Sequence, residues 1–363
     1  MSLVTFLGIW FVREARIDLA TVGAAFLCEH VLRGLAAPMF GALSDRIGRR
    51  PLLLAAALGS AAVLPCFLLV EGPASLFAWS VAMGICGAVN MPVANALLLD
   101  LASPEKRQST LALNYTVMSV AYTIGVSPAG YVAEQGYGLL AALASAGYFL
   151  VALLYLFALR GALPMERAQR NEGFFIDTIS VVKDRQFLRF ASLAFVFPLS
   201  MGLVVSASPL FATENGLGEG FIGLVLGLNS IIVALLAVPV AARIEVGGPF
   251  RPLGAAALTV AACFACFTWV PQPAAALIAG TVVFSFAELV FSSAVPAAVA
   301  RLAPAGRRGA YQGGWALVSS FSMGSALFFS GLLRDAVGWR GTWMVFAALA
   351  AVLGVLLLKR VRH

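Results

Sequence analysis

Long apolar runs separated by short polar segments make up almost the whole chain. Each run holds roughly 20 residues, the length that a helix needs to cross about 30 Å of hydrocarbon. The runs lack the strict polar–apolar alternation that strands of a membrane barrel show. The pattern predicts an all-α polytopic membrane protein whose twelve helical spans are 1–12, 19–43, 51–71, 75–99, 108–132, 137–160, 188–212, 220–243, 252–270, 273–300, 308–334 and 339–358.

Composition supports a membrane protein, and the charge distribution predicts its orientation. Of the 363 residues, 61% are hydrophobic and 11% are charged, whereas soluble domains average about 25% charged. The net charge of +7 could suggest a nucleic-acid partner, but its placement follows the connections between spans. The positive-inside rule predicts that the basic connections and the C-terminus are cytoplasmic, with a lipid bilayer and no nucleic acid as partner. The opposite connections hold only Arg13, Arg16, Arg334 and Arg340, with Arg33 inside a span.

The sequence offers no clear metal, cofactor or enzyme site. Cys263-x-x-Cys266 has the spacing of a metal or redox site, but it lies mid-span without a second pair. His30 and His363 are the two histidines, and the scattered carboxylates form no convergent catalytic group. We expect no metal, no cofactor and no enzyme activity.

A glycine motif precedes the span at 220–243. Gly216-x-Gly218-x-Gly220 lies in a short connection, without the strand that a phosphate-binding loop needs. We therefore interpret it as a turn.

The chain divides into two halves joined by a polar segment. The segment 161–187 separates an expected six-helix bundle over 1–160 from a second one over 188–363. Within it, Phe175 and Ile179 are spaced for one face of a helix, which predicts an interfacial helix along the inner leaflet.

The two halves resemble each other at an offset close to 200 residues. "APMFGALSDRIGRRPLLLAAAL" aligns with "AVPVAARIEVGGPFRPLGAAAL", pairing Pro38 with Pro239 and Arg50 with Arg251. "LASPEKR" aligns with "LAPAGRR" at a similar offset. Parallel repeats of six spans are typical of transporters.

The repeat makes the first span look incomplete. The second half's first span begins near Leu188, about 13 residues before the counterpart of Met1, and 12 helical residues reach only roughly 18 Å. No basic region or small-residue cleavage site marks a signal peptide. We therefore expect the native start to lie upstream or the chain to be truncated.

A charged turn between the second and third spans carries a family resemblance. "GALSDRIGRRPLL" at 41–53 resembles the signature G-x-L-x-D-R-x-G-R-R of the major facilitator superfamily. The resemblance implies two six-helix bundles around a central site, and a cytoplasmic cluster that latches the halves in the outward-facing state. A simpler interpretation is that the arginines only enforce topology. The second half has Val246 where Asp45 would fall, so we expect an asymmetric latch. The predicted gating residues are Gly41, Asp45, Arg46, Gly48, Arg49 and Arg50.

Two motifs that are typical of proton antiporters are incomplete in this chain. The family resemblance therefore supports transport more strongly than drug–proton exchange. Proton antiporters of this superfamily usually carry an arginine four residues before a glycine in span 4, where this chain has Ser80 before Gly84. Their fifth span usually reads G-P-x-x-G-G, whereas this chain has Ser127-Pro128 followed by Gly130.

Ionisable groups inside a span are costly, so we treat them as candidates for a proton or substrate pathway. Glu29 and Arg33 stand four residues apart and either neutralise each other or leave Glu29 or His30 as a proton carrier. Glu288 lies near the middle of its span without a basic neighbour in that span. Asn90 and Asn229 reach a similar depth, and either bind substrate or join helices.

These features predict a secondary transporter that works by alternating access, because no G-x-x-x-x-G-K-[ST] motif occurs. Few charges would line the cavity, which favours proton-coupled efflux of a small, fairly apolar compound. The alternative is uptake or facilitated transport of a sugar or other small metabolite, and a sensor or scaffold would be expected to add a soluble domain. We expect a monomer in a bacterial inner membrane.

Overall fold

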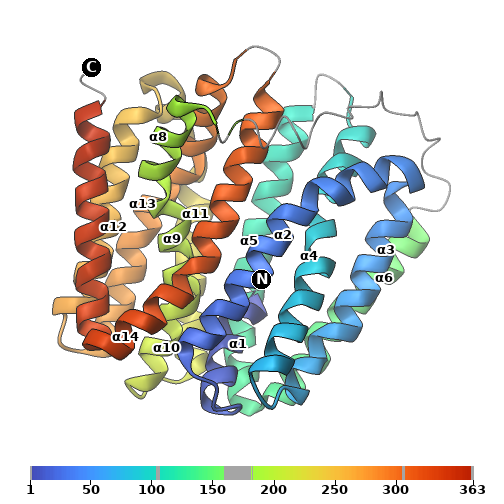
Figure 1. The fold of residues 1–363 in the computed structure, drawn as a ribbon, viewed down its shortest axis with the longest axis horizontal. Coiled ribbons are helices and arrows are strands. Elements are labelled where there is room, and N and C mark those ends of the chain that lie inside the picture. The colour runs from blue at the N-terminus through green and yellow to red at the C-terminus, as the bar shows by residue number, and fades with distance from the viewer. Residues whose placement is uncertain (1, 104–106, 159–180, 182, 305–306, 361–363) are drawn as a thin grey trace.

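The computed structural model describes residues 2–103, 107–158, 181, 183–304 and 307–360. The described residues form helices and short connections without a strand, so the predicted all-α polytopic fold is confirmed (Figure 1). The interfacial helix predicted within 161–187 falls almost entirely outside the described residues.

Capping and turn residues mark several helix ends in the first half. Asp18 accepts a 2.8 Å hydrogen bond from the Thr21 amide and caps the second helix. Gly48, at φ 96°, separates the second helix from the third, because few other residues adopt that conformation. The elements are α1 (Ser2–Arg13), α2 (Leu19–Ile47), α3 (Arg49–Val63) with the 3₁₀ helix η1 (Leu64–Leu69), α4 (Pro73–Leu101), α5 (Arg107–Gln135) and α6 (Tyr137–Ala158).

The second half begins with a span made of several short helices. It ends with two spans that follow each other directly within α14 (Arg308–Arg360). The span Arg185–Glu214 consists of α8 (Arg185–Ala194), α9 (Val196–Gly202), the π-helical segment η3 (Leu203–Ala207) and α10 (Ser208–Glu214). It is followed by α11 (Glu219–Gly247), α12 (Phe250–Trp269) and α13 (Pro273–Leu302). The helix α14 (Arg308–Arg360) breaks at Gly338, φ 69°, which separates the two predicted spans 308–334 and 339–358.

The molecule has two ends, which we name by their charge. The basic end carries the α2–α3 turn and the C-terminal end of α14, at the top of Figure 1. The opposite end carries the connections before α2, α4, α11 and α13.

The most extensive contacts between the halves are those of α2 with α14 and of α5 with α11, and α1 also contacts α10 and η3. Small residues allow the backbones to approach, since a Cβ on Gly23 would lie 2.3 Å from the Phe328 amide nitrogen. On the other seam, the Ser127 hydroxyl donates to the Gly223 carbonyl oxygen at 3.1 Å. Both contacts lie toward the opposite end, so the halves are tightly packed there.

Candidate functional site

A cavity of about 2720 Å³ lies between the halves. Its walls come from α2, α4, α5, α6, α9, α13 and α14, with smaller parts from α1 and α3. It extends to the basic end, where Asp45, Arg46 and Arg49 line it. Because the seams are packed at the opposite end, the geometry is that of a cavity open toward the basic end.

The predicted pair Glu29 and Arg33 forms an ion pair on the cavity wall. Glu29 is buried, with 3% of its surface exposed. Two glycines of α4 make room for the pair, since a Cβ on Gly87 would lie 2.7 Å from the Arg33 guanidinium and one on Gly84 would lie 3.1 Å from the Glu29 carbonyl oxygen. The Nε atom of Arg33 is buried without a hydrogen-bond partner, so the guanidinium keeps one donor unused.

His30 lies on the seam between the halves as well as on the cavity wall. Its Nδ1 atom is 2.9 Å from the Phe26 carbonyl oxygen in the preceding turn. A Cβ on Gly324 of α14 would lie 2.7 Å from the His30 Cβ, so the imidazole packs where α2 crosses the other half.

Glu288 and Asn229 come together in the second half. The Asn229 amide donates to Glu288 Oε2 at 3.0 Å, and the Ser285 hydroxyl donates to Asn229 Oδ1 at 2.7 Å. Glu288 lines the cavity with 8% of its surface exposed. Among the described residues Glu288 has no ion-pair partner, in contrast to Glu29.

Other residues on the cavity wall include some that the sequence did not single out. Asn90, a candidate from the sequence, lines the cavity, and the Asn114 amide, also on the wall, donates to Asn95 Oδ1 at 3.1 Å. Tyr148 of α6 also lines it. Six of the nine methionines face this one space, which no local sequence pattern indicates. They are Met39, Met83, Met91, Met118, Met201 and Met323.

The charged turn at the basic end makes its described contacts inside the first half. Asp45 pairs with Arg49, which also reaches Asp100 at the end of α4 with 3.1 Å between Nε and Oδ2. Arg50 donates to the Leu156 carbonyl oxygen of α6 at 2.7 Å. The cluster therefore fixes α2, α3, α4 and α6 to one another, while the cavity beside it is open.

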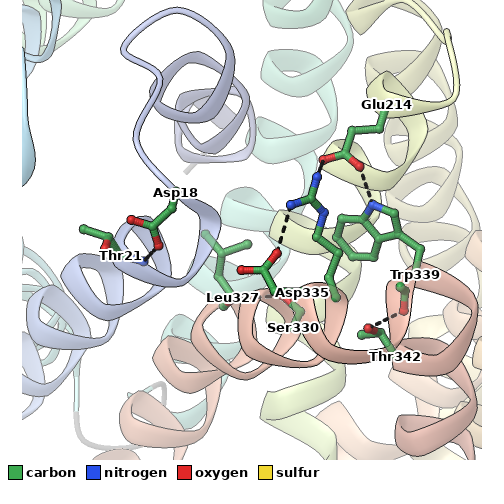
Figure 2. Close-up of polar contacts among 10 residues, drawn as sticks. Asp18, Thr21, Glu214, Leu327, Ser330, Asp335, Trp339 and Thr342 are labelled. Carbon is green, nitrogen blue, oxygen red and sulfur yellow. Dashed lines mark hydrogen bonds and ion pairs between the residues drawn. The ribbon is translucent and has the colours of Figure 1, made fainter.

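The opposite end of the second half has its own polar cluster (Figure 2). Glu214 accepts hydrogen bonds from Arg334 at 2.8 Å and from the Trp339 indole at 2.7 Å. The same view shows Asp18 capping α2 through Thr21, and the hydrogen bond to Thr21 holds the Asp18 pKa below its usual value. The described residues contain no group of three or more possible metal ligands.

Two helical halves enclose a largely apolar cavity with a few polar side chains. This arrangement is typical of polytopic membrane transporters. The chain belongs to the Major Facilitator Superfamily, whose family model matches residues 1–244 and 190–363.

Two curated relatives that are at least 30% identical match over shorter segments. The tetracycline resistance protein, class C, of Escherichia coli is 36% identical over 146 residues, which are 39% of this chain and 34% of that protein. A Na(+), Li(+), K(+)/H(+) antiporter of Planococcus maritimus is 30% identical over 127 residues, or 33% and 29% of the two chains. These alignments thus span about a third of either relative.

Solved structures match over nearly the whole chain. The crystal structure of the nucleoside transporter NupG superposes with a TM-score of 0.79 at 14% identity, over 100% of this chain and 97% of that one. The structure of the human organic anion transporter MFSD10 gives a TM-score of 0.65 at 20% identity, over 98% and 89%. At these identities the likeness establishes the shared fold.

Proposed function

We propose that this protein is a secondary transporter that exports small, fairly apolar compounds in exchange for protons by alternating access. The positive-inside rule orients the basic end to the cytoplasm of an inner membrane, with the C-terminus on that side. The cavity of this structure would then load from the cytoplasm, and the protein would act as a monomer.

The lining of the cavity supports an apolar and varied substrate. Methionine side chains are flexible and polarisable, so a surface rich in them adapts to ligands of different shape. Aromatic side chains, among them Phe26, Tyr148, Phe291 and Trp315, add flat contact area. The charges of Glu29 and Arg33 neutralise each other, so the wall suits an uncharged or weakly charged compound better than a multiply charged one.

The observation that carries the proton coupling is the pairing of Glu288 with a neutral amide. A charge buried without a counter-charge is costly, so the Glu288 carboxyl group holds its proton in this state. Opening of the cavity on the other side would change its surroundings and release the proton. A substrate in the same cavity competes with that proton, which is the basis of exchange.

The test is substrate-driven proton movement in liposomes that contain the purified protein. We would add hydrophobic compounds and, separately, sugars to wild type, Glu288→Gln, Glu29→Gln and the control Glu71→Gln, an exposed glutamate at the opposite end. We expect hydrophobic compounds to move protons in wild type and Glu71→Gln, and Glu288→Gln to lose coupling. Flux of a compound with no proton movement would contradict the coupling, and flux of sugars alone would favour the metabolite alternative.

A further inference from the structure

The glycine motif before α11 leaves a helix terminus without a side-chain cap. The α11 helix begins at Glu219, and Gly218 at its N-cap position has no side chain to offer. The first amide groups of a helix have no partner within the helix and need an acceptor from elsewhere. The first amide groups of α11 therefore need a hydrogen-bond acceptor from outside this connection.

Glu134 of the first half supplies that acceptor. The Gly220 amide donates to Glu134 Oε1 at 2.9 Å, so a carboxylate at the end of α5 caps the N-terminus of α11. A Cβ on Gly218 or Gly220 would lie 2.3 Å or 2.9 Å from the Glu134 carboxylate oxygens, so both glycines are needed for this approach. A negative charge at a helix N-terminus is favoured by the helix dipole as well as by the hydrogen bond.

A second carboxylate, from the second half, is bound by residues of the first half. Glu219, on α11 of the second half, accepts from the Tyr137 hydroxyl at 3.3 Å and lies 3.6 Å from Arg13 Nη1, both of the first half. Beside it, a Cβ on Gly130 would lie 2.3 Å from the Glu219 carbonyl oxygen. Each half thus contributes one carboxylate that is held by the other.

We propose that Glu134 is a cross-half clamp that holds the opposite end closed while the cavity is open at the basic end. The cap exists only while α5 and α11 are in contact, so separation of the halves at this end must break it. Glu134 is a positioning residue that biases the conformational equilibrium and lies away from the substrate cavity. The proposal rests on the alternating-access part of the proposed function, and requires neither a particular substrate nor proton coupling.

The experiment uses double electron–electron resonance between two spin labels to measure how far apart the halves are at the opposite end. Spin labels are placed at Glu71→Cys and Gln272→Cys, two exposed positions in connections of the first and second half. The five native cysteines are replaced by alanine. Helix caps of this kind typically shift an equilibrium roughly five- to tenfold. We expect Glu134→Ala to raise the ratio of the long-distance to the short-distance population by that factor, and Glu134→Gln, which keeps an acceptor oxygen, to raise it less.

A cap supplied within α11 distinguishes a clamp from a local stabiliser. In the Glu134→Ala background, Gly218→Ser places a capping hydroxyl on the same helix. We expect this second change to restore thermal stability and to leave the raised distance ratio in place. Asp18→Ala is the matched control, because it removes a carboxylate cap at the same end but within one half. It should lower stability without changing the ratio.

Two results would overturn the clamp. One is a wild-type ratio in Glu134→Ala, and the other is full reversal of the shift by Gly218→Ser. Two populations with an unchanged ratio would remove the clamp and leave alternating access intact, whereas one population in every variant would contradict both.

Discussion

The interiors of the two halves differ near the basic end, although segments of their sequences resemble each other. In the second half, Phe187 and Phe190 of α8 are buried, and Phe190 packs edge-on against Phe250 at 6.3 Å between ring centroids. In the first half, the described chain places no such segment between α3, α4 and α6. There the cavity enters the bundle and is lined by Tyr148 and Tyr155.

The counterpart helices α3 and α12 face different surroundings among the described residues. The counterpart helices α3 and α12 share the "RPL" start of the repeat. Among the described residues, α3 contributes Ala57 and Ser60 to the cavity lining, whereas α12 contributes none. In the second half, aromatic side chains of α8 and α9 are buried, among them Phe187, Phe190 and Phe197.

The largest expected effect tests the filling of the second half. Phe187→Ala removes a fully buried ring and should lower the free energy of unfolding by about 3–5 kcal/mol. Leu143→Ala, on the cavity wall of the first half and 54% exposed, should cost less than about 1 kcal/mol. Denaturation in mixed micelles measures both. Equal losses would mean that the two interiors are packed alike.

The next effect compares the buried carboxylates of the two halves. Arg33→Ala leaves Glu29 buried without its counter-charge and should cost about 3 kcal/mol. Asn229→Ala removes only a neutral partner of Glu288 and should cost about 1–2 kcal/mol. The double variant Glu29→Ala/Arg33→Ala should recover most of the first loss. A double-mutant cycle without coupling energy would show that the ion pair does not stabilise α2.

A smaller effect tests the room that α4 leaves for Arg33. Gly87→Ala should cost about 1 kcal/mol, because the new Cβ would lie 2.7 Å from the guanidinium, which must move away from Glu29. Gly147→Ala on α6 is the matched control, since nothing lies within 4 Å of its added Cβ. The measurement is again the free energy of unfolding, with both glycines in helices of the same half. A neutral Gly87→Ala would show that the pair tolerates displacement.

An effect of similar size concerns two helix caps, Asp184 at the start of α8 and Asp18 at the start of α2. Asp184 accepts from the Gln186 amide at 2.7 Å, and the Tyr311 hydroxyl beside it holds the Asp184 pKa below its usual value. A lowered pKa in the folded state gives a stabilisation that is complete above about pH 4 and is lost as the pH falls through the folded-state pKa. Asp184→Ala should lower the free energy of unfolding by about 1 kcal/mol at neutral pH. It should have no effect at a pH below the folded-state pKa of Asp184.

The control for the cap is Tyr311→Phe. This variant should bring the Asp184 pKa back toward its usual value and move the loss of stability to higher pH, as followed by unfolding at several pH values. The cap of Asp18 in the first half should titrate unchanged in the same variant, because its hydrogen-bond partner is Thr21. A shift of both caps would mean that Tyr311 acts on the whole fold.

Local patterns predicted the helices better than their ends and irregularities. The expected span 19–43 is observed as α2, which continues to Ile47, because nothing before Gly48 stops it. The expected span 51–71 is α-helical only to Val63 and then becomes the 3₁₀ helix η1, where Pro65 lacks an amide donor. Hydropathy reports burial in lipid and does not distinguish these helix types.

The candidate site was predictable where its residues share a helix. The spacing of Glu29 and Arg33 predicted a pair, and the structure forms it. The contact of Glu288 with Asn229 joins two helices, whose relative rotation comes from packing that a single sequence does not reveal. The same holds for the glycine motif. Gly216, at φ 82°, confirms the predicted turn, but the fit of its neighbours to Glu134 depends on a residue more than 80 positions away.

The aromatic packing of the second half has an optical consequence. Trp339 and Trp343 are stacked with ring centroids 5.6 Å apart and planes 17° from parallel, and Phe267 stacks on Trp343 at 4.8 Å. Two indole rings at this distance couple their electronic transitions, so they should produce a paired circular-dichroism band near the ultraviolet absorption of tryptophan. Trp10 in the first half packs edge-on against Phe67 instead. The second half therefore carries a spectroscopic signature of its own, and its packing can be followed in the unlabelled protein.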